Sequence, residues 1–136
     1  MPAGGSRMPP SHETVDKRLH FVKQEGQAVF KFAVKHMGDI SAQLLAEHGL
    51  KTEDVAVMVP HQANLRIINA CADRLKMPLD HVMINIQKYG NTTSGTLPLA
   101  TRDAVDQGKL KKGDYVLFAA VGAGFTVGAS LWRWEI

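Results

Sequence analysis

The chain has 136 residues, 45% of them hydrophobic and 21% charged, which is enough to bury the core of one ordinary domain and is atypical of a disordered protein. Its formal net charge of +3 and isoelectric point near 9.1 are mild, and no stretch resembles a nucleic-acid-binding module, so we expect no nucleic acid partner. The basic run from Lys109 to Lys112 is typical of a solvated loop, with docking of an acidic partner as the alternative.

The apolar stretches predict neither a membrane span nor a secretory signal. The longest uncharged stretch, residues 115–132, is interrupted by Gly122, Gly124 and Gly128. The first residues, Met1 to Gly5, lack the apolar segment that a signal peptide needs. The sequence therefore indicates a soluble protein.

The single cysteine indicates a reducing compartment and offers little as a nucleophile. One cysteine cannot form an internal disulfide, which fits the cytoplasm. Cys71 lies within a helical pattern, with Ile67, Ile68 and Leu75 at helical spacings. We therefore expect it to be buried and without a catalytic role.

Hydrophobic spacing divides the chain into an irregular lead-in, residues 1–18, and one domain, residues 19–136. The run Leu19-His20-Phe21-Val22 suggests a short strand. From Gln27 to His48, apolar residues recur at spacings of three and four, which predicts an amphipathic helix closed by Gly49.

Strands and helices then alternate. Residues 55–59 and 82–86 are continuous apolar runs that predict buried strands. Helices are predicted over residues 62–76 and 95–107, and Pro98 is tolerable in the first turn of the second. Residues 115–121 and 126–134 predict an antiparallel hairpin. The order indicates an α/β fold: a mixed sheet of four or five strands with packed helices.

Polar residues follow two of the predicted strands. His61 comes directly after residues 55–59, and Asn91 follows residues 82–86 through Gly90. Ligands of α/β proteins bind at the carboxyl ends of strands, so both side chains are expected to face one crevice. An imidazole and a carboxamide placed there could donate hydrogen bonds to an oxygen that gains negative charge. A capping or structural role is an equally open interpretation of each.

Gly122-Ala123-Gly124 joins the last two predicted strands and is open to two interpretations. It could be a flexible hairpin, or a loop whose backbone N–H groups approach a ligand as an oxyanion hole requires. The six histidines have no short ligand spacing and no cysteine pair beside them, so we expect no metal site.

Three motifs closely resemble the carboxyl-terminal half of β-ketoacyl-acyl-carrier-protein synthase III, the initiating condensing enzyme of bacterial fatty acid synthesis in the thiolase-like superfamily. They are Val59–Arg66, Tyr89–Ser94 and Gly122–Thr126, in the same order as in the family. The resemblance runs from about Phe21 to the C-terminus. It implies a thiolase-like fold of two similar halves, a cytoplasmic location, and a homodimer in the complete enzyme.

In that family a Cys-His-Asn triad takes an acyl group from coenzyme A onto the cysteine, decarboxylates malonyl-carrier protein and joins the two. The resemblance places the family's histidine and asparagine at His61 and Asn91, and its oxyanion loop around Ala123. It also implies that Asn64 hydrogen-bonds in the pantetheine tunnel and that Arg66 contacts the acyl carrier protein or coenzyme A phosphate. Coenzyme A thioester would be a substrate, and no cofactor or metal is implied.

Two departures from the family pattern bear on function. Val121 precedes the glycine loop where the family has an aromatic residue, and Ala123 replaces its middle glycine. The triad cysteine belongs to the family's amino-terminal half, which this sequence does not contain. We therefore expect a fragment or separately expressed half that is inactive alone and that exposes an apolar face where the missing amino-terminal half packs. The alternatives are a sister acyltransferase of secondary metabolism and a non-catalytic half that acts as a binding partner.

Overall fold

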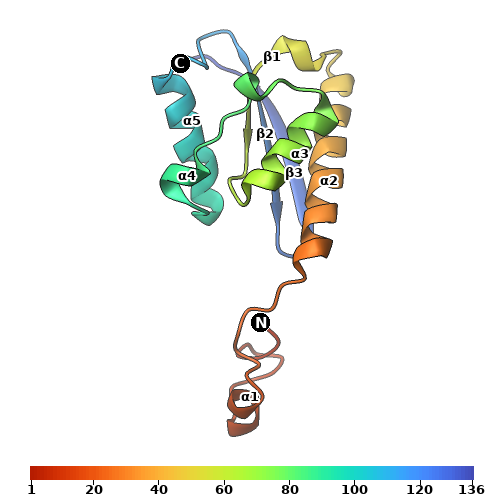
Figure 1. Cartoon of the computed structure of the whole chain (residues 1–136), viewed down its shortest axis with the longest axis vertical. Helices are drawn as coiled ribbons and strands as arrows, with labels where there is room; N and C mark the ends of the chain where they lie inside the picture. The colour runs from red at the N-terminus through yellow and green to blue at the C-terminus, as the bar shows by residue number, and fades with distance from the viewer.

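The computed structural model describes residues 1–136 and contains one mixed sheet with helices on both faces (Figure 1). The sheet has three strands in the order β1 (Val55–Pro60), β2 (Tyr115–Gly122) and β3 (Thr126–Arg133). β1 and β2 are parallel, and β2 and β3 form the predicted antiparallel hairpin. The α/β class, the mixed sheet and the terminal hairpin are therefore confirmed.

The first face of the sheet packs against helices α2 (Gly26–Glu47) and α3 (Leu65–Leu75). α2 has the predicted amphipathic spacing, so that Ala33, Met37 and Leu45 all point into this core. The helix closes at Gly49, whose φ of +66° suits glycine, while the amide of Leu50 donates to the carbonyl of Leu45 over 2.9 Å.

The second face carries α5 (Thr96–Asp106), which packs on β1 through a smaller cluster. Ala100 and Ala104 of α5 are fully buried against Val57 and Val59 of β1. Small residues let the helix lie close to the sheet. Pro98 stands in the first turn, where no intrahelical hydrogen bond is lost.

The expected strand over residues 82–86 was wrong, and with it the count of four or five strands. Only Val82 forms a bridge, to Met58 of β1, and the chain then turns into the short helix α4 (Ile86–Tyr89). The side chain of Gln62 takes the place of a neighbouring strand: it donates to the carbonyl of Met83 and accepts from the amide of Asn85. A side chain can supply one such pair of bonds but not a ladder, so the pairing stops there.

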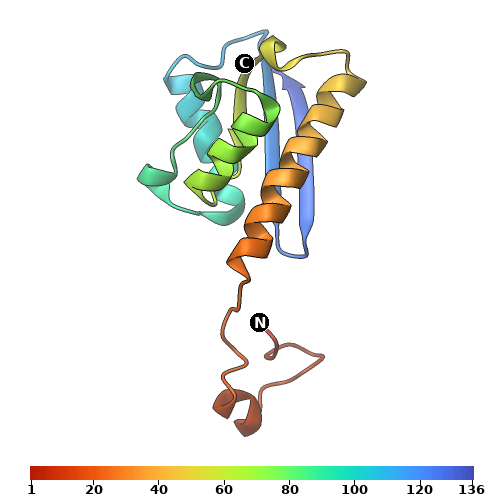
Figure 2. The same ribbon diagram turned by 45° about the vertical axis from the view of Figure 1, so that its right-hand side comes forward.

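The strand suggested at Leu19–Val22 was also wrong. The amide of Leu19 donates to the carbonyl of Thr14 and so closes the short helix α1 (His12–Asp16), while Phe21 and Val22 are exposed. Both views show residues 1–25 as an arm that extends away from the sheet before α2 begins (Figure 2). No helix of the structure is long and apolar enough to cross a membrane.

Candidate functional site

One cleft, with a volume of about 980 Å³, lies where β1, the segment after α4 and the β2–β3 loop meet. It is partly walled by the end of the N-terminal arm and the start of α2. Of the site residues named from the sequence, five line it; Asn64 and Arg66 do not. These five are His61, Asn91 and the loop residues Gly122, Ala123 and Gly124.

His61 stands directly after β1, and its backbone amide still donates to Ala119 of β2 over 2.8 Å. The ring is half-buried, and its Nδ1 lies 2.6 Å from the hydroxyl Oγ1 of Thr96, the first residue of α5. Burial lowers the pKa of the His61 imidazole below its ordinary value of 6.5, which favours the neutral ring at neutral pH. No protein group is bonded to Nε2, which leaves this nitrogen for a ligand.

Asn91 reaches the same cleft from a different kind of element than expected. The short helix α4 and Gly90 lead into Asn91, where the sequence had predicted a strand. The φ of Gly90, +68°, turns the chain back toward the cleft. The Oδ1 of Asn91 accepts from the amide of Thr93 over 3.0 Å. Because the oxygen is held in this way, the Nδ2 amide group of Asn91 is the part left to donate to a ligand.

The β2–β3 loop brings backbone groups to the cleft. Gly122, Ala123 and Gly124 are exposed. Gly124 has a φ of +148°, and a Cβ there would lie 2.6 Å from the Thr126 hydroxyl, so a side chain does not fit. Phe125 stacks on Phe32 of α2 with ring centroids 4.4 Å apart, which holds the loop beside the helix.

Gln62, next to His61, is almost fully buried and ties the His61 turn to the segment that leads to Asn91. Its Nε2 donates to the carbonyls of Pro60 at 2.8 Å and Met83 at 3.0 Å, and its Oε1 accepts from the amide of Asn85 at 3.0 Å. This one carboxamide therefore makes three hydrogen bonds to backbone. It fixes the end of β1 relative to residues 83–85.

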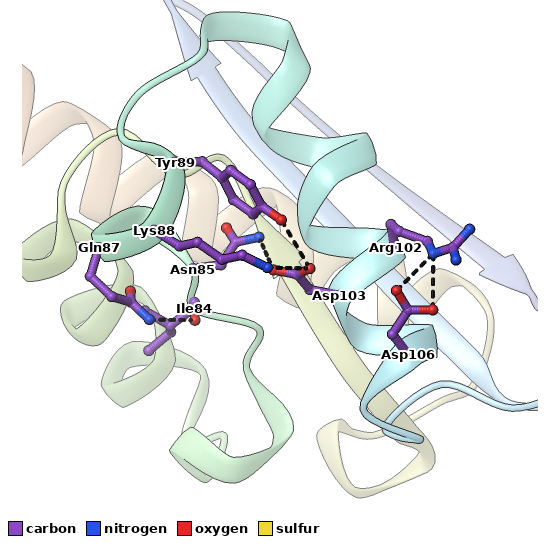
Figure 3. A network of polar contacts seen from close by, with 8 residues as sticks. All are labelled: Ile84, Asn85, Gln87, Lys88, Tyr89, Arg102, Asp103 and Asp106. Carbon is purple, nitrogen blue, oxygen red and sulfur yellow. Dashed lines mark hydrogen bonds and ion pairs between the residues drawn. The ribbon is translucent and has the colours of Figure 1, made fainter.

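Asp103 of α5 holds the other end of that segment (Figure 3). Its Oδ2 accepts from the side-chain Nδ2 of Asn85 at 2.9 Å, and its Oδ1 accepts from the Tyr89 hydroxyl at 3.3 Å and from the Lys88 ammonium at 3.4 Å. The Asn85 hydrogen bond, with smaller help from Lys88 and Tyr89, lowers the pKa of the Asp103 carboxyl. All three donors come from the turn that precedes Asn91, so the carboxylate anchors this turn to α5.

Sequence reasoning missed Asn85, Thr96 and Asp103 as parts of the site's support. Each contacts a residue at least 14 positions away, and no local pattern marks such contacts. Gln62 was included only as part of the predicted helix over residues 62–76 and of the motif Val59–Arg66. Its place between His61 and the apolar helix was the one available signal.

Asn64 and Arg66 have other contacts in this structure. Asn64 caps α3: its Oδ1 accepts from the amide of Arg66 over 2.9 Å. The Arg66 guanidinium lies over the Phe30 ring of α2, 5.7 Å from its centroid. Both side chains are exposed, beside the cleft in sequence but not among its lining residues.

Cys71 is buried, as predicted. Its Sγ lies 4.0 Å from the carbonyl of Ala33, and burial raises the pKa of the thiol to about 11. Such a thiol is almost entirely protonated at neutral pH, and only the thiolate is a good nucleophile. No group of three or more His, Cys, Asp or Glu side chains is placed to hold a metal ion.

Comparisons of the sequence place these residues in a known family. The family model described as 3-oxoacyl-[acyl-carrier-protein (ACP)] synthase III C terminal matches residues 45–134. β-Ketoacyl-[acyl-carrier-protein] synthase III of Solibacter usitatus is 66% identical over 134 residues, and that of Koribacter versatilis is 59% identical over the same length. Each match covers 98% of this chain and 40% of the relative, so the chain spans about 40% of the length of these relatives.

Solved structures agree in fold. The synthase III of Aquifex aeolicus VF5 superposes with a TM-score of 0.81 at 44% identity, over 84% of this chain and 37% of that chain. Another 3-oxoacyl-(acyl-carrier-protein) synthase III gives a TM-score of 0.90 at 26% identity, over 98% of this chain and 42% of that chain. The thiolase-like fold is therefore established, and this chain belongs to the 3-oxoacyl-[acyl-carrier-protein] synthase III family, in which it matches the C-terminal domain.

Proposed function

We propose that this chain supplies the decarboxylation and condensation part of a β-ketoacyl-acyl-carrier-protein synthase III site. The observation that carries the proposal is the shared cleft of His61, Asn91 and the Gly122–Gly124 loop. The family relationship supports it. The substrates would be an acyl-coenzyme A and malonyl-carrier protein, with no metal or further cofactor.

The site's geometry suits the malonyl half-reaction. Loss of carbon dioxide from malonyl-carrier protein leaves an electron pair on the α-carbon, and the thioester oxygen becomes enolate-like. His61 Nε2–H and Asn91 Nδ2–H would both donate to that oxygen. The carbanion then attacks the acyl thioester of an enzyme cysteine, forms the new carbon–carbon bond, and releases the cysteine as thiolate. A backbone N–H near Ala123 would hold the acyl oxygen during attack.

The nucleophile would come from outside these 136 residues. Cys71 is buried beneath α2 with a pKa of about 11, so it cannot accept the acyl group. We propose that a cysteine of an amino-terminal half provides the acyl-enzyme, within a cytoplasmic homodimer, as the resemblance implies. Asn64 and Arg66, exposed at the start of α3, would contact the pantetheine arm and the acyl carrier protein.

The proposal is tested on the protein produced from its complete natural reading frame, mixed with acetyl-coenzyme A and malonyl-carrier protein. The 3-oxoacyl product is measured by mass spectrometry. His61→Ala and Asn91→Ala should each lower its rate by about 100- to 1000-fold, the effect of removing one oxyanion donor. His48→Ala, which removes an exposed imidazole at the end of α2, is the matched control.

No product from the unaltered protein, or full activity in both site variants, would overturn the proposal. In the same reaction, no acetyl adduct should form on Cys71; a labelled peptide that contains it would show that the chain carries its own nucleophile. If the natural reading frame encodes no other cysteine, binding of acyl carrier protein without acyl transfer is the remaining function to measure.

A second candidate differs in substrate only. Val121 lines the cleft at the point where the family has an aromatic residue. A smaller side chain there leaves more room for the acyl group, which would suit a sister acyltransferase of secondary metabolism. Comparing kcat/KM over acyl-coenzyme A chain lengths decides between them: a maximum beyond acetyl favours the second candidate.

A further inference from the structure

The β2–β3 loop has few hydrogen bonds to hold it at the cleft. Strand pairing in the hairpin ends at Gly122 and Thr126, and residues 123–125 make no backbone-to-backbone hydrogen bond. The one side-chain hydrogen bond in this loop runs from the Thr126 hydroxyl to the carbonyl of Ala123, over 3.3 Å. Because Gly122, Ala123 and Gly124 are also exposed, hydrogen bonds and burial do little to fix the direction of their N–H groups.

An aromatic stack connects the same loop to helix α2. The rings of Phe125 and Phe32 have centroids 4.4 Å apart and planes inclined by 21°, which is a stacked geometry. Both views place the hairpin turn beside the first turns of α2, to which Phe32 belongs (Figures 1 and 2). Phe125 remains 47% exposed, so the stack holds this ring more than general burial does.

Phe32 is a firm support for the loop because its helix is anchored in the core. The next residue, Ala33, is fully buried beneath the helix. His36, one turn further along α2, packs on Phe32 with ring centroids 4.2 Å apart. Phe125 lines the cleft, but Phe32 does not. The route from Phe32 to a bound substrate therefore runs through the loop.

We propose that Phe32 is a positioning residue for the Gly122–Gly124 loop, whose backbone N–H groups it holds at the cleft through its stack with Phe125. The stack follows from the contact between the two rings. Its catalytic consequence rests on the proposed function, in which a backbone N–H near Ala123 holds the acyl oxygen during attack. A loop that moves has this donor in place for less of the time, which slows the chemical step.

The order of the loop is measured by nuclear magnetic resonance on protein from the natural reading frame, labelled with ¹³C in its alanine methyl groups. The Ala123 methyl lies in the loop, and an Ala123→Gly sample assigns its signal. We expect an order parameter of about 0.85 in the unaltered protein and below about 0.6 in Phe32→Leu. Leucine removes the ring but keeps an apolar side chain that favours the helix. Phe32→Tyr keeps the ring and should keep the loop ordered.

Phe21→Leu is the matched control. It makes the same substitution on the N-terminal arm, where Phe21 is 57% exposed and lies beside the Arg18 guanidinium. The order of the Ala123 methyl should not change in this variant. An order parameter that stays near about 0.85 in Phe32→Leu, or that falls equally in both variants, would refute the role of the stack.

Turnover shows whether the two rings act through each other. Phe32→Leu and Phe125→Leu should each lower kcat for condensation roughly 3- to 10-fold, the range for the loss of one aromatic pair. In Phe32→Leu the KM should change little, because the loop's donor acts in the transition state. The double variant should be no slower than the slower single variant, since the stack is already lost. Losses that multiply in the double variant would show that the rings act independently and would overturn the proposal.

The two measurements separate the stack from the proposed function. If the loop loses order in Phe32→Leu but the unaltered protein makes no product, the proposed function fails and the role of Phe32 in holding the loop remains. If the unaltered protein is active and the loop stays ordered in Phe32→Leu, the role of Phe32 fails and the proposed function remains.

Discussion

At the scale of single residues, the site depends on how each polar side chain divides its hydrogen bonds between protein and cleft. His61 and Asn91 each give one atom to the protein, Nδ1 to Thr96 and Oδ1 to the Thr93 amide. The atoms left over, Nε2 and Nδ2, are nitrogens at which a hydrogen can be donated. If a negative oxygen forms between these two nitrogens, as the proposed function requires, two donors held in this way would need little reorganisation.

The lowered pKa of His61 predicts a particular pH dependence of stability. A histidine whose folded pKa lies below its unfolded value binds a proton more readily when unfolded, so its contribution to the free energy of unfolding is full above about pH 6.5. That contribution is lost as pH falls through the lower folded-state pKa. Thermal melts of the natural protein from pH 7.5 to 5 should therefore decline less steeply in His61→Gln.

The lowered pKa of His61 can also be measured directly in the folded protein. The His61 ring should titrate by nuclear magnetic resonance below pH 6.5, since burial opposes its charged form. A midpoint above 6.5 would contradict the neutral imidazole on which the donor role depends. Parallel melting curves for the two proteins would contradict the linkage in the same way.

At the scale of elements, hydrophobic spacing predicts the helices and strands correctly where one face packs on the core. It fails where hydrogen bonds from a single side chain replace strand pairing. The spacing of Phe30, Met37 and Leu45 predicts α2 because one face meets the sheet. The hairpin follows from two long apolar runs around glycines. Residues 82–86 have the composition of a strand, yet Gln62 occupies the position of their neighbour, and no pattern of hydrophobicity contains that information.

The candidate site was predictable to a similar depth. His61, Asn91 and the Gly122–Gly124 loop were located because the motifs follow apolar runs, and all of them line the cleft. The element before Asn91 was wrong, since the chain enters through α4 rather than a strand. Asp103 is one of many acidic residues on a helix, and only the fold brings it to Asn85.

The hydrogen bond from the Asn85 side chain to the Asp103 carboxylate can be tested by exchanging the donor and the acceptor. Asn85→Asp places two carboxylates at hydrogen-bond distance in a buried site, which should lower the free energy of unfolding by about 1 to 3 kcal/mol and condensation by roughly tenfold or more. The double variant Asn85→Asp/Asp103→Asn restores a donor and an acceptor in the opposite sense. In the double variant, the carboxamide oxygen at position 103 can still accept from the Tyr89 hydroxyl. Condensation activity and the free energy of unfolding should therefore recover substantially.

Asp106→Asn is the matched control for this pair. It removes a carboxylate from the same helix that bonds only to Arg102 on the exposed side (Figure 3). Such a surface ion pair contributes little to stability. A double variant no better than Asn85→Asp alone, in both denaturant unfolding and turnover, would show that the bond between these two side chains does not hold the turn.

At the scale of the whole molecule, the two faces of the hairpin differ in how they are covered. Leu117, Ala119 and their partners on β3 pack under α2 and α3. On the opposite face, α5 covers β1 and Val116 but leaves β3 open. Trp132 lies there, 60% exposed, with its ring edge-on to Phe118 at 6.5 Å between centroids. An open aromatic face beside a covered one is typical of a surface that packs on another domain or chain.

The 136-residue chain should therefore self-associate through this face when it is produced alone. Trp132→Lys should weaken the association by about 30-fold, since removing a central interface tryptophan costs roughly 2 kcal/mol. Sedimentation velocity over a concentration series measures this directly. Val15→Lys is the matched control, because Val15 is 61% exposed but lies on the N-terminal arm, and it should leave the association unchanged. Equal weakening by both substitutions would mean that added charge, not the sheet face, controls association, and a chain that stays monomeric at about 100 µM would mean that β3 needs no cover.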